Sequence, residues 1–156
     1  MAEKRIAIFP GSFDPFTKGH EEIALRGANL FDELIIGVGH NTNKQRYFPL
    51  EITIQKIGML FEETPNISVK SYQVLTTTFA KDNGARFILR GLRNTIDFEY
   101  ENSIAQANRK INGDIETVFL MTSPLFGHVS SSIIREMHKF GQDLSVFMPY
   151  EVEDAK

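Results

Sequence analysis

The chain has 156 residues, of which 42% are hydrophobic and 24% are charged, so its length and composition are those of one globular domain. It contains no cysteine, which excludes disulfides, thiolate metal sites and a cysteine nucleophile. With 17 basic and 20 acidic residues the formal charge is -3, which disfavours general attraction to nucleic acid or to an anionic membrane.

Strand and helix patterns alternate along the chain. Short apolar runs bounded by turn residues predict strands, and apolar residues at a period of about 3.6 predict helices. In chain order the sequence predicts a strand at 6–9, a helix through Ile23, Gly27, Leu30 and Phe31, a strand at 34–38, a helix through Leu50, Ile54, Ile57 and Phe61, a strand at 67–69, a helix at 76–82, a strand at 87–89, a helix at about 97–110, a strand at 118–121 and a helix that begins at Ser131 and includes Phe140.

This alternation predicts an α/β fold of the doubly wound, Rossmann-like type, with a five-stranded parallel sheet and helices on both faces. No repeat or linker divides the sequence, so we expect a single domain over residues 1–156. The apolar run at 6–9 is too short for a signal peptide or a membrane span, and we expect a soluble protein. Ligands of such a fold bind beyond the carboxyl ends of the strands, so the loops there hold the candidate site.

The segment from Pro10 to His20 follows the first strand and leads into the first helix. Gly11 allows a sharp turn, Ser12 offers a hydroxyl group, and Gly19 lets a phosphate approach the free N–H groups of the helix start. A protonated or N–H-donating imidazole of His20 could contact a phosphate oxygen whose charge grows during transfer. The alternative is an ordinary turn with a capping histidine. The segment lacks the Gly-Lys-Ser/Thr of a P-loop.

Two arginines are expected at the same rim. Arg90 ends the predicted fourth strand, Gly91 permits close approach of a ligand to the backbone, and Arg93 follows. Two guanidinium groups can hold phosphate oxygens bidentately. Such a pair is more often solvated or ion-paired at a surface, and that alternative stays open on these residues alone.

Serines and one lysine extend the candidate anion site. Ser130, Ser131 and Ser132 precede an apolar helix, which needs only one cap residue, so the triplet suggests phosphate binding beside capping. Lys44 lies in the polar loop after the second strand, where a flexible cation could neutralise a phosphate, and Arg46 competes with it for that role.

The sequence offers no resident metal site. The remaining histidines, His40, His128 and His138, have no zinc-site spacing, and Glu99 and Glu101 stand two apart on a predicted helix and therefore face apart. Magnesium binds nucleotide phosphates through few protein ligands, so ATP would bring Mg²⁺ without a motif.

Taken together, four motifs carry a family resemblance. They are Gly-Ser-Phe-Asp-Pro with Thr-x-Gly-His at 11–20, Arg-Gly-Leu-Arg with Asp-Phe-Glu-Tyr-Glu at 90–101, Asn-Arg at 108–109, and Val-Ser-Ser-Ser at 129–132. In this order and at this spacing the chain resembles the bacterial phosphopantetheine adenylyltransferases, within the nucleotidyltransferase superfamily that bears an H/T-x-G-H signature. The resemblance spans nearly the whole chain and implies one nucleotidyltransferase domain over residues 1–156.

The resemblance implies that ATP and 4'-phosphopantetheine give dephospho-coenzyme A and pyrophosphate, by in-line attack of the acceptor phosphate without a covalent enzyme intermediate. It selects Lys44 over Arg46 and implies three groups of site residues. These are His20, Lys44 and Arg90 as catalytic residues; Ser12, Lys44, Thr76 and Arg90 as phosphopantetheine ligands; and Ser12, Phe13, His20, Gly91, Leu92, Arg93, Glu101, Phe126, Ser130, Ser131 and Ser132 as ATP ligands. It also implies a cytoplasmic homohexamer, Mg²⁺ brought with ATP, and coenzyme A as a candidate feedback inhibitor.

Two residues depart from the family pattern: Val74 stands where relatives often carry an acidic residue, and Phe126 where some carry tryptophan. Three alternative functions are considered. A sister transferase would act on nicotinate mononucleotide or cytidylylate a phosphorylated alcohol, and Arg90 to Glu101 argue against it. An aminoacyl-tRNA synthetase needs domains for which 156 residues leave no room. A non-catalytic nucleotide sensor would not need Ser12, His20, Lys44 and Arg90.

Overall fold

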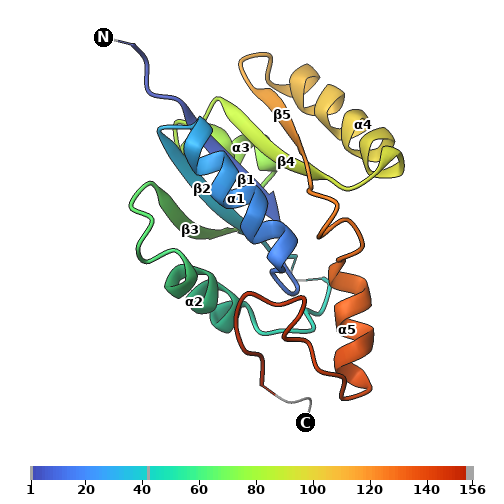
Figure 1. Ribbon diagram of the computed structural model, residues 1–156. Coiled ribbons are helices and arrows are strands. Elements are labelled where there is room, and N and C mark those ends of the chain that lie inside the picture. The colour runs from blue at the N-terminus through green and yellow to red at the C-terminus, as the bar shows by residue number, and fades with distance from the viewer. Residues whose placement is uncertain (1, 42, 154–156) are drawn as a thin grey trace.

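The computed structural model describes residues 2–41 and 43–153, which form one α/β domain (Figure 1). The elements alternate throughout. They are β1 (Ile6–Gly11), α1 (Lys18–Leu30), β2 (Glu33–Gly39), α2 (Leu50–Leu60), β3 (Ile67–Tyr72), α3 (Thr76–Asp82), β4 (Phe87–Leu92), α4 (Thr95–Ile111), β5 (Glu116–Met121) and α5 (Ser131–Lys139). Every predicted element is present, and the predicted fold class is confirmed.

The five strands form one parallel sheet in the order β3-β2-β1-β4-β5. The order reverses direction between β1 and β4, so this is the switch point where doubly wound folds bind ligands. The loop after β1 and the end of β4 therefore meet at one place. In Figure 1, α5 and the C-terminal segment lie below the sheet, beyond the carboxyl ends of the strands.

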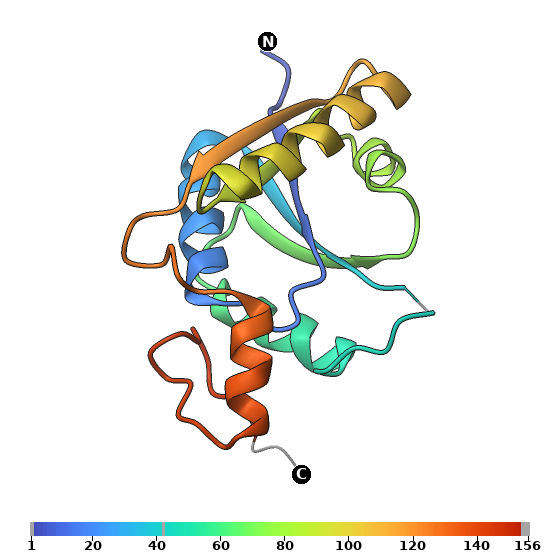
Figure 2. The same ribbon diagram turned by 90° about the vertical axis from the view of Figure 1, so that its right-hand side faces the viewer.

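Two apolar layers sandwich the sheet. On one face α1 and α2 pack against alternate strand residues, with Ala7, Phe9, Leu34 and Leu89 at the centre of the larger core cluster. On the other face α3 packs on Ile8, Ile35 and Ile88, and α4 covers β4 and β5 (Figures 1 and 2). The interiors of β1 and β2 are buried on both faces, which is why their sequences read as continuous apolar runs.

The structure corrects the end of the fourth strand. We expected Arg90 at its end, but β4 continues to Leu92 and Arg90 pairs in register with Phe119 of β5. The apolar run stops at Leu89 because the Arg90 side chain has a charged partner on α4 in place of an apolar one. Arg90 consequently projects from within the sheet, which holds its backbone rigidly.

The segment after α5 contributes to the core although no sequence pattern predicted structure there. Residues 141–153 form no helix or strand, yet Leu144 and Met148 are buried against Val129 and Ile134 in a third core cluster. The backbone N–H of Lys18, at the first position of α1, donates to the Phe147 carbonyl at 2.9 Å. This segment therefore packs against the start of α1. No helix within residues 2–41 and 43–153 combines the length and hydropathy required to span a membrane.

Candidate active site

The loop between β1 and α1 turns at Phe13 and not at Gly11. Phe13 has a positive φ of 47°, whereas Gly11 ends a regular strand. A Cβ atom on Gly11 would lie 2.9 Å from the Phe13 ring, so the glycine makes room for that ring. The expectation that Gly11 provides the turn is therefore wrong, and the phenyl ring of Phe13 is buried. Only the backbone of Phe13 is suited to polar contact with a ligand.

His20 is at once a capping residue and a lining residue of a cavity. Thr17 caps α1, and its backbone N–H donates to Nδ1 of His20 at 3.0 Å. The ring packs among Phe9, Phe13 and Phe16, with a centroid separation of 5.0 Å from Phe13. Because Nδ1 accepts a hydrogen bond, the neutral ring carries its proton on Nε2. The two roles considered for His20 therefore use different nitrogen atoms: Nδ1 takes part in capping α1, and Nε2 is left for a ligand.

Burial, which has the largest effect, and the positive charges of Arg90 and Arg93 together lower the pKa of His20 to about 3. Of the two forms considered from sequence, the neutral N–H donor is therefore the one present near neutral pH. His20, Arg90 and Arg93 line the same cavity. A neutral imidazole can stabilise a developing phosphate charge by donating a hydrogen bond from its N–H group, and it does not need to be protonated to the imidazolium form.

The ring nitrogens of His20 should give the signals of a neutral Nε2–H tautomer throughout the range from pH 5 to pH 9. Nitrogen-15 NMR of the imidazole tests this directly, with the exposed ring of His128 as a comparison in the same spectra. Since the folded pKa is depressed, the unfolded chain binds more protons between about pH 3 and pH 6.5, and the contribution of His20 to stability is lost as the pH falls through that window. A titration of His20 near pH 6.5 would contradict the assignment.

Arg90 is held by two carboxylate hydrogen bonds. Its Nε and Nη2 donate to the two carboxylate oxygens of Glu101 at 2.8 and 2.5 Å, and Nη1 donates to the Pro10 carbonyl. Glu101 is the one buried residue among those of α4, and the exposed Glu99 faces away, as their spacing predicts. Two of the five N–H groups of Arg90 therefore remain for a ligand.

Arg93 has a similar arrangement, with Nε and Nη2 donating to the carboxylate of Asp97 at 2.9 and 3.0 Å. This hydrogen bonding raises the pKa of Arg93 and lowers that of Asp97. The ion-paired alternative considered from sequence is thus correct for both arginines. The bidentate edge that we expected to hold phosphate is occupied by carboxylates, so phosphate would meet only the remaining N–H groups.

Gly91 serves packing more than ligand approach. A Cβ atom there would lie 3.0 Å from Cγ1 of Ile23 on α1, so the glycine admits that side chain. The expected close approach of a ligand is therefore not the reason for the glycine, although Gly91 does line a cavity. The side chain of Leu92 is buried, and Leu92 lines none of the three cavities around Ser12 within the described residues.

Each hydroxyl group of the serine triplet has a protein partner. Ser130 caps α5 by accepting from the Ile133 N–H, Ser131 donates to the Pro15 carbonyl at 2.8 Å, and Ser132 accepts from Arg135 at 3.2 Å. Ser130 is thus the cap residue, Ser131 and Ser132 bind other parts of the chain, and phosphate binding by the triplet stays a prediction. All three serines still line a cavity with His20, where the N–H groups of the first turn of α5 lie.

Three cavities meet at Ser12. A cavity of about 300 Å³ gathers most of the expected ATP ligands, and we call it the inner cavity; its lining includes Ser12, Phe13, His20, Arg90, Gly91, Arg93, Glu101, Phe126, Ser130, Ser131 and Ser132. A cavity of about 1020 Å³, the outer cavity, is lined by Ser12, Lys44 and Thr76 together with Val74. A third cavity of about 210 Å³ contains Ser12, Thr76, Arg90 and Glu101. Lys44 and His20 therefore lie in different cavities that share Ser12.

Sequence reasoning missed several lining residues. His40, Gln73 and Arg135 line the outer cavity, and Asp97 and Thr122 line the inner one. Most of these residues follow a predicted strand or begin a helix, and that position in the sequence could have identified them.

Two expected ligands contact other parts of the protein. The hydroxyl of Thr76 shares a hydrogen bond of 3.1 Å with the hydroxyl of Tyr72. Phe126 lies opposite the start of α1, and its Cβ atom would be 3.6 Å from a Cβ on Gly19.

The chain matches the model of the cytidylyltransferase-like family over residues 8–137. It is 56% identical to a phosphopantetheine adenylyltransferase of Cytophaga hutchinsonii over 95% of this chain and 99% of the relative. It is 47% identical to a phosphopantetheine adenylyltransferase of Bacteroides fragilis over 96% of this chain and 99% of that relative.

Solved structures share the fold at low sequence identity. A bifunctional NMN adenylyltransferase/ADP ribose pyrophosphatase from Francisella tularensis superposes with a TM-score of 0.74 at 14% identity, covering 95% of this chain and 46% of the other. A putative nicotinate-nucleotide adenylyltransferase from Vibrio parahaemolyticus gives a TM-score of 0.67 at 16% identity, covering 94% of this chain and 87% of the other. At these identities the likeness concerns the fold alone.

Proposed function

We propose that this chain, which belongs to the cytidylyltransferase-like family and within it to the phosphopantetheine adenylyltransferases, transfers the adenylyl group of ATP to 4'-phosphopantetheine. The products are dephospho-coenzyme A and pyrophosphate, a step of coenzyme A biosynthesis. The observation that carries the proposal is the 56% identity to a phosphopantetheine adenylyltransferase over 95% of the chain. The consumption of ATP also supports a cytoplasmic location.

The arrangement of cavities supports a two-substrate reaction. We assign ATP to the inner cavity with its cationic and N–H-rich lining, and phosphopantetheine to the outer cavity that carries Lys44 and Thr76. Ser12 borders both cavities, so the two reacting phosphates would meet beside it. Arg90 borders the inner cavity and the third cavity, and the third cavity shares Ser12 and Thr76 with the outer one, so an acceptor phosphate that reaches past Thr76 would meet Arg90.

The chemistry needs no strong protein base. The acceptor phosphate is already anionic near neutral pH and attacks the α-phosphorus of ATP in line, so positioning and charge stabilisation dominate. We assign the neutral Nε2–H of His20 to a phosphate oxygen that gains charge in the transition state. Lys44 would neutralise the incoming phosphate. Arg90 would hold this phosphate with the two N–H groups that do not donate to Glu101 or to the Pro10 carbonyl.

Magnesium would enter with the nucleotide. Within the described residues no three histidine, aspartate or glutamate side chains come together, and the two carboxylates of the inner cavity, Asp97 and Glu101, are paired with arginines. The donor set therefore fits an ion held mainly by ATP phosphates and water. Its chemistry would be to neutralise charge on the pyrophosphate leaving group.

Pyrophosphate release from ATP tests the function. We expect release in the presence of Mg²⁺ with 4'-phosphopantetheine and none with nicotinate mononucleotide; CTP with a phosphorylated alcohol should also give none. Release with another acceptor alone would identify a sister transferase. No release with any acceptor, despite ATP binding, would identify a nucleotide sensor.

Two properties implied by the resemblance are proposed with the function. A homohexamer is supported by the apolar side chains that α4 leaves exposed, among them Ile96, Tyr100 and Ile111, and light scattering should then return six times the chain mass of 17.7 kDa. Coenzyme A, which resembles the product, should compete with phosphopantetheine for the outer cavity. Non-competitive inhibition would contradict a shared cavity.

A further inference from the structure

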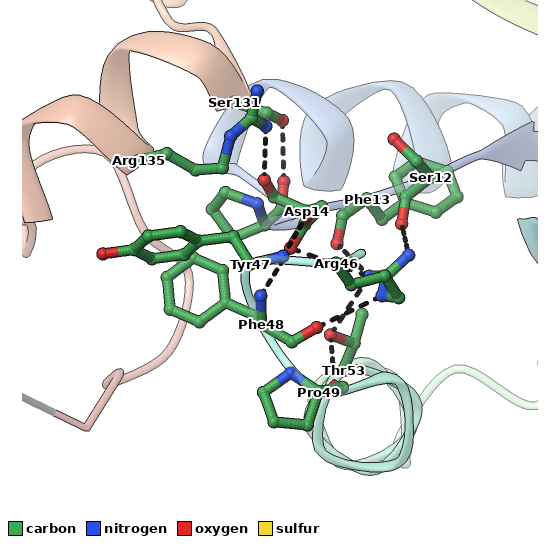
Figure 3. Close-up of polar contacts among 11 residues, drawn as sticks. Ser12, Phe13, Asp14, Arg46, Tyr47, Phe48, Pro49, Thr53, Ser131 and Arg135 are labelled. Atoms are coloured by element: carbon green, nitrogen blue, oxygen red, sulfur yellow. Dashed lines mark hydrogen bonds and ion pairs between the residues drawn. The ribbon is translucent and has the colours of Figure 1, made fainter. Parts of the chain in front are cut away.

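Side chains from distant parts of the chain hold the carbonyl groups of the loop from Ser12 to Pro15 (Figure 3). Each of four consecutive carbonyl oxygens accepts a hydrogen bond. The donors are Nη1 of Arg46 to Ser12 at 2.6 Å, Nη2 of Arg46 to Phe13 at 3.3 Å, Nη1 of Arg135 to Asp14 at 2.7 Å, and Oγ of Ser131 to Pro15 at 2.8 Å. Arg46 alone holds the first two, those of Ser12 and Phe13.

Arg46 is itself fixed in place from several directions. Its Nε donates to the Phe48 carbonyl at 3.2 Å, and its side chain is only 14% exposed, 3.9 Å from the Asp14 carboxylate. That carboxylate accepts the backbone N–H groups of Tyr47 and Phe48 at 2.8 and 2.7 Å. The loop that carries Arg46 is therefore bound to the loop that carries Ser12 through both side chains, as Figure 3 shows.

These contacts occupy most of the hydrogen-bonding capacity of the guanidinium. Nη2 also reaches the Thr53 hydroxyl at 3.5 Å, so four of the five N–H groups have protein partners. Burial lowers the pKa of Arg46, while the charge of Asp14 acts in the opposite direction. Arg46 is thus committed to the protein, whereas the exposed Lys44 two residues earlier lies free of such contacts among the side-chain hydrogen bonds of the described residues.

Holding a carbonyl also aims the N–H group on the other side of the same peptide bond. In a trans peptide the C=O and the following N–H point in opposite directions. A Ser12 carbonyl directed at Arg46 therefore sends the Phe13 N–H away from Arg46, and Ser12 and Phe13 line the inner cavity, whose lining does not include Arg46. Phe13 has φ of 47°, a conformation that a non-glycine residue holds only when its surroundings stabilise it.

We propose that Arg46 is a positioning residue for adenylyl transfer, which acts by holding the Ser12 and Phe13 carbonyls so that the Ser12 hydroxyl and the Phe13 N–H face the reacting phosphates. The proposal rests on the proposed function for its kinetic part. A lysine cannot replace the arginine, because one ammonium group does not reach the Ser12, Phe13 and Phe48 carbonyls that the planar guanidinium spans.

The kinetic test compares Arg46→Lys and Arg46→Ala with Arg86→Lys and Arg86→Ala. Arg86 also pairs with a carboxylate, that of Glu3, but lies before β4 at the opposite edge of the sheet from the cavities. We expect both Arg46 variants to lose about 10²-fold in kcat at temperatures where they remain folded, because a misplacement of about 1 Å costs that much. The KM for phosphopantetheine should change little, and guanidinium chloride below its denaturing range should restore part of kcat to Arg46→Ala.

Hydrogen exchange tests the clamp without any substrate. A peptide covering residues 10–17 should exchange faster in Arg46→Lys than in the wild type, and at the wild-type rate in Arg86→Lys. Unchanged exchange, unchanged kcat, or a raised KM with unchanged kcat would each overturn the proposal, the last by indicating direct substrate contact. If the wild type instead releases pyrophosphate with another acceptor, the proposed function fails, and the same comparison with that acceptor still decides the role of Arg46.

Discussion

Replacing His20 by alanine should lower the turnover of adenylyl transfer by about 10²- to 10³-fold, the usual effect of removing one donor that stabilises transition-state charge. The neutral Nε2–H of His20 lies in the cavity that Arg90 and Arg93 also line. Its contribution counts most where phosphate charge grows, so kcat should fall more than the affinity for either substrate. The measurement is pyrophosphate release at saturating ATP and phosphopantetheine.

Two further variants separate catalysis from capping. Alanine also removes the acceptor of the Thr17 N–H, at a cost of about 1 kcal/mol in stability. His20→Asn offers an amide oxygen near the position of Nδ1 and should restore the cap without restoring turnover. His20→Gln can place an amide N–H near the position of Nε2 and should recover part of kcat. An alanine variant as fast as the wild type would show that the imidazole takes no part.

Replacing Arg90 by methionine should abolish most activity and also lower the free energy of unfolding by about 3 kcal/mol, the lower end of the usual cost of removing one partner of a buried ion pair, because the Arg90 side chain is 29% exposed. Glu101, at 8% exposure, would keep a carboxylate without its guanidinium partner. The measurements are urea unfolding and pyrophosphate release on the same preparation.

The double variant Arg90→Met, Glu101→Leu distinguishes the two effects. Apolar residues of similar size in place of a buried ion pair are often neutral or stabilising, so the double variant should regain most of the lost stability. Its turnover should stay as low as that of Arg90→Met, because the cation at the junction of the cavities is still missing. Recovery of turnover together with stability would mean that Arg90 acts through the fold alone.

Local patterns account for the parts of the fold that were predicted. Apolar runs flanked by turn residues marked all five strands, and α3 and the start of α5 were predicted at the positions observed. The end of β4 was misplaced because a charged residue continues the strand, and no apolar pattern signals a buried ion pair with a residue eleven positions later. Residues 141–153 have no period to detect, because they pack as irregular chain around Leu144 and Met148.

The positions of many site residues were predicted from the sequence, but their hydrogen-bond partners and protonation states were not. Gly19, His20, Arg90 and Ser130–132 were found because their residue types and their places after strands indicate anion binding, and the structure brings all of them to the inner cavity. Their chemical states were not predictable. The partners of two of these residues come from distant segments: Arg90 donates to the Pro10 carbonyl and to Glu101, and Ser131 donates to the Pro15 carbonyl.

The alternation of elements, the parallel sheet, the family and the residue types available for phosphate chemistry follow from the amino-acid sequence, since these depend on local periodicity and on motifs within short segments. The neutral state of His20, the ion pairs of Arg90 and Arg93, and the separation of Lys44 and His20 into cavities joined at Ser12 follow from the fold. Burial and pairing are properties of groups that meet in space, and the groups concerned can be far apart in the sequence, as Pro10 and Arg90 are at a separation of 80 positions.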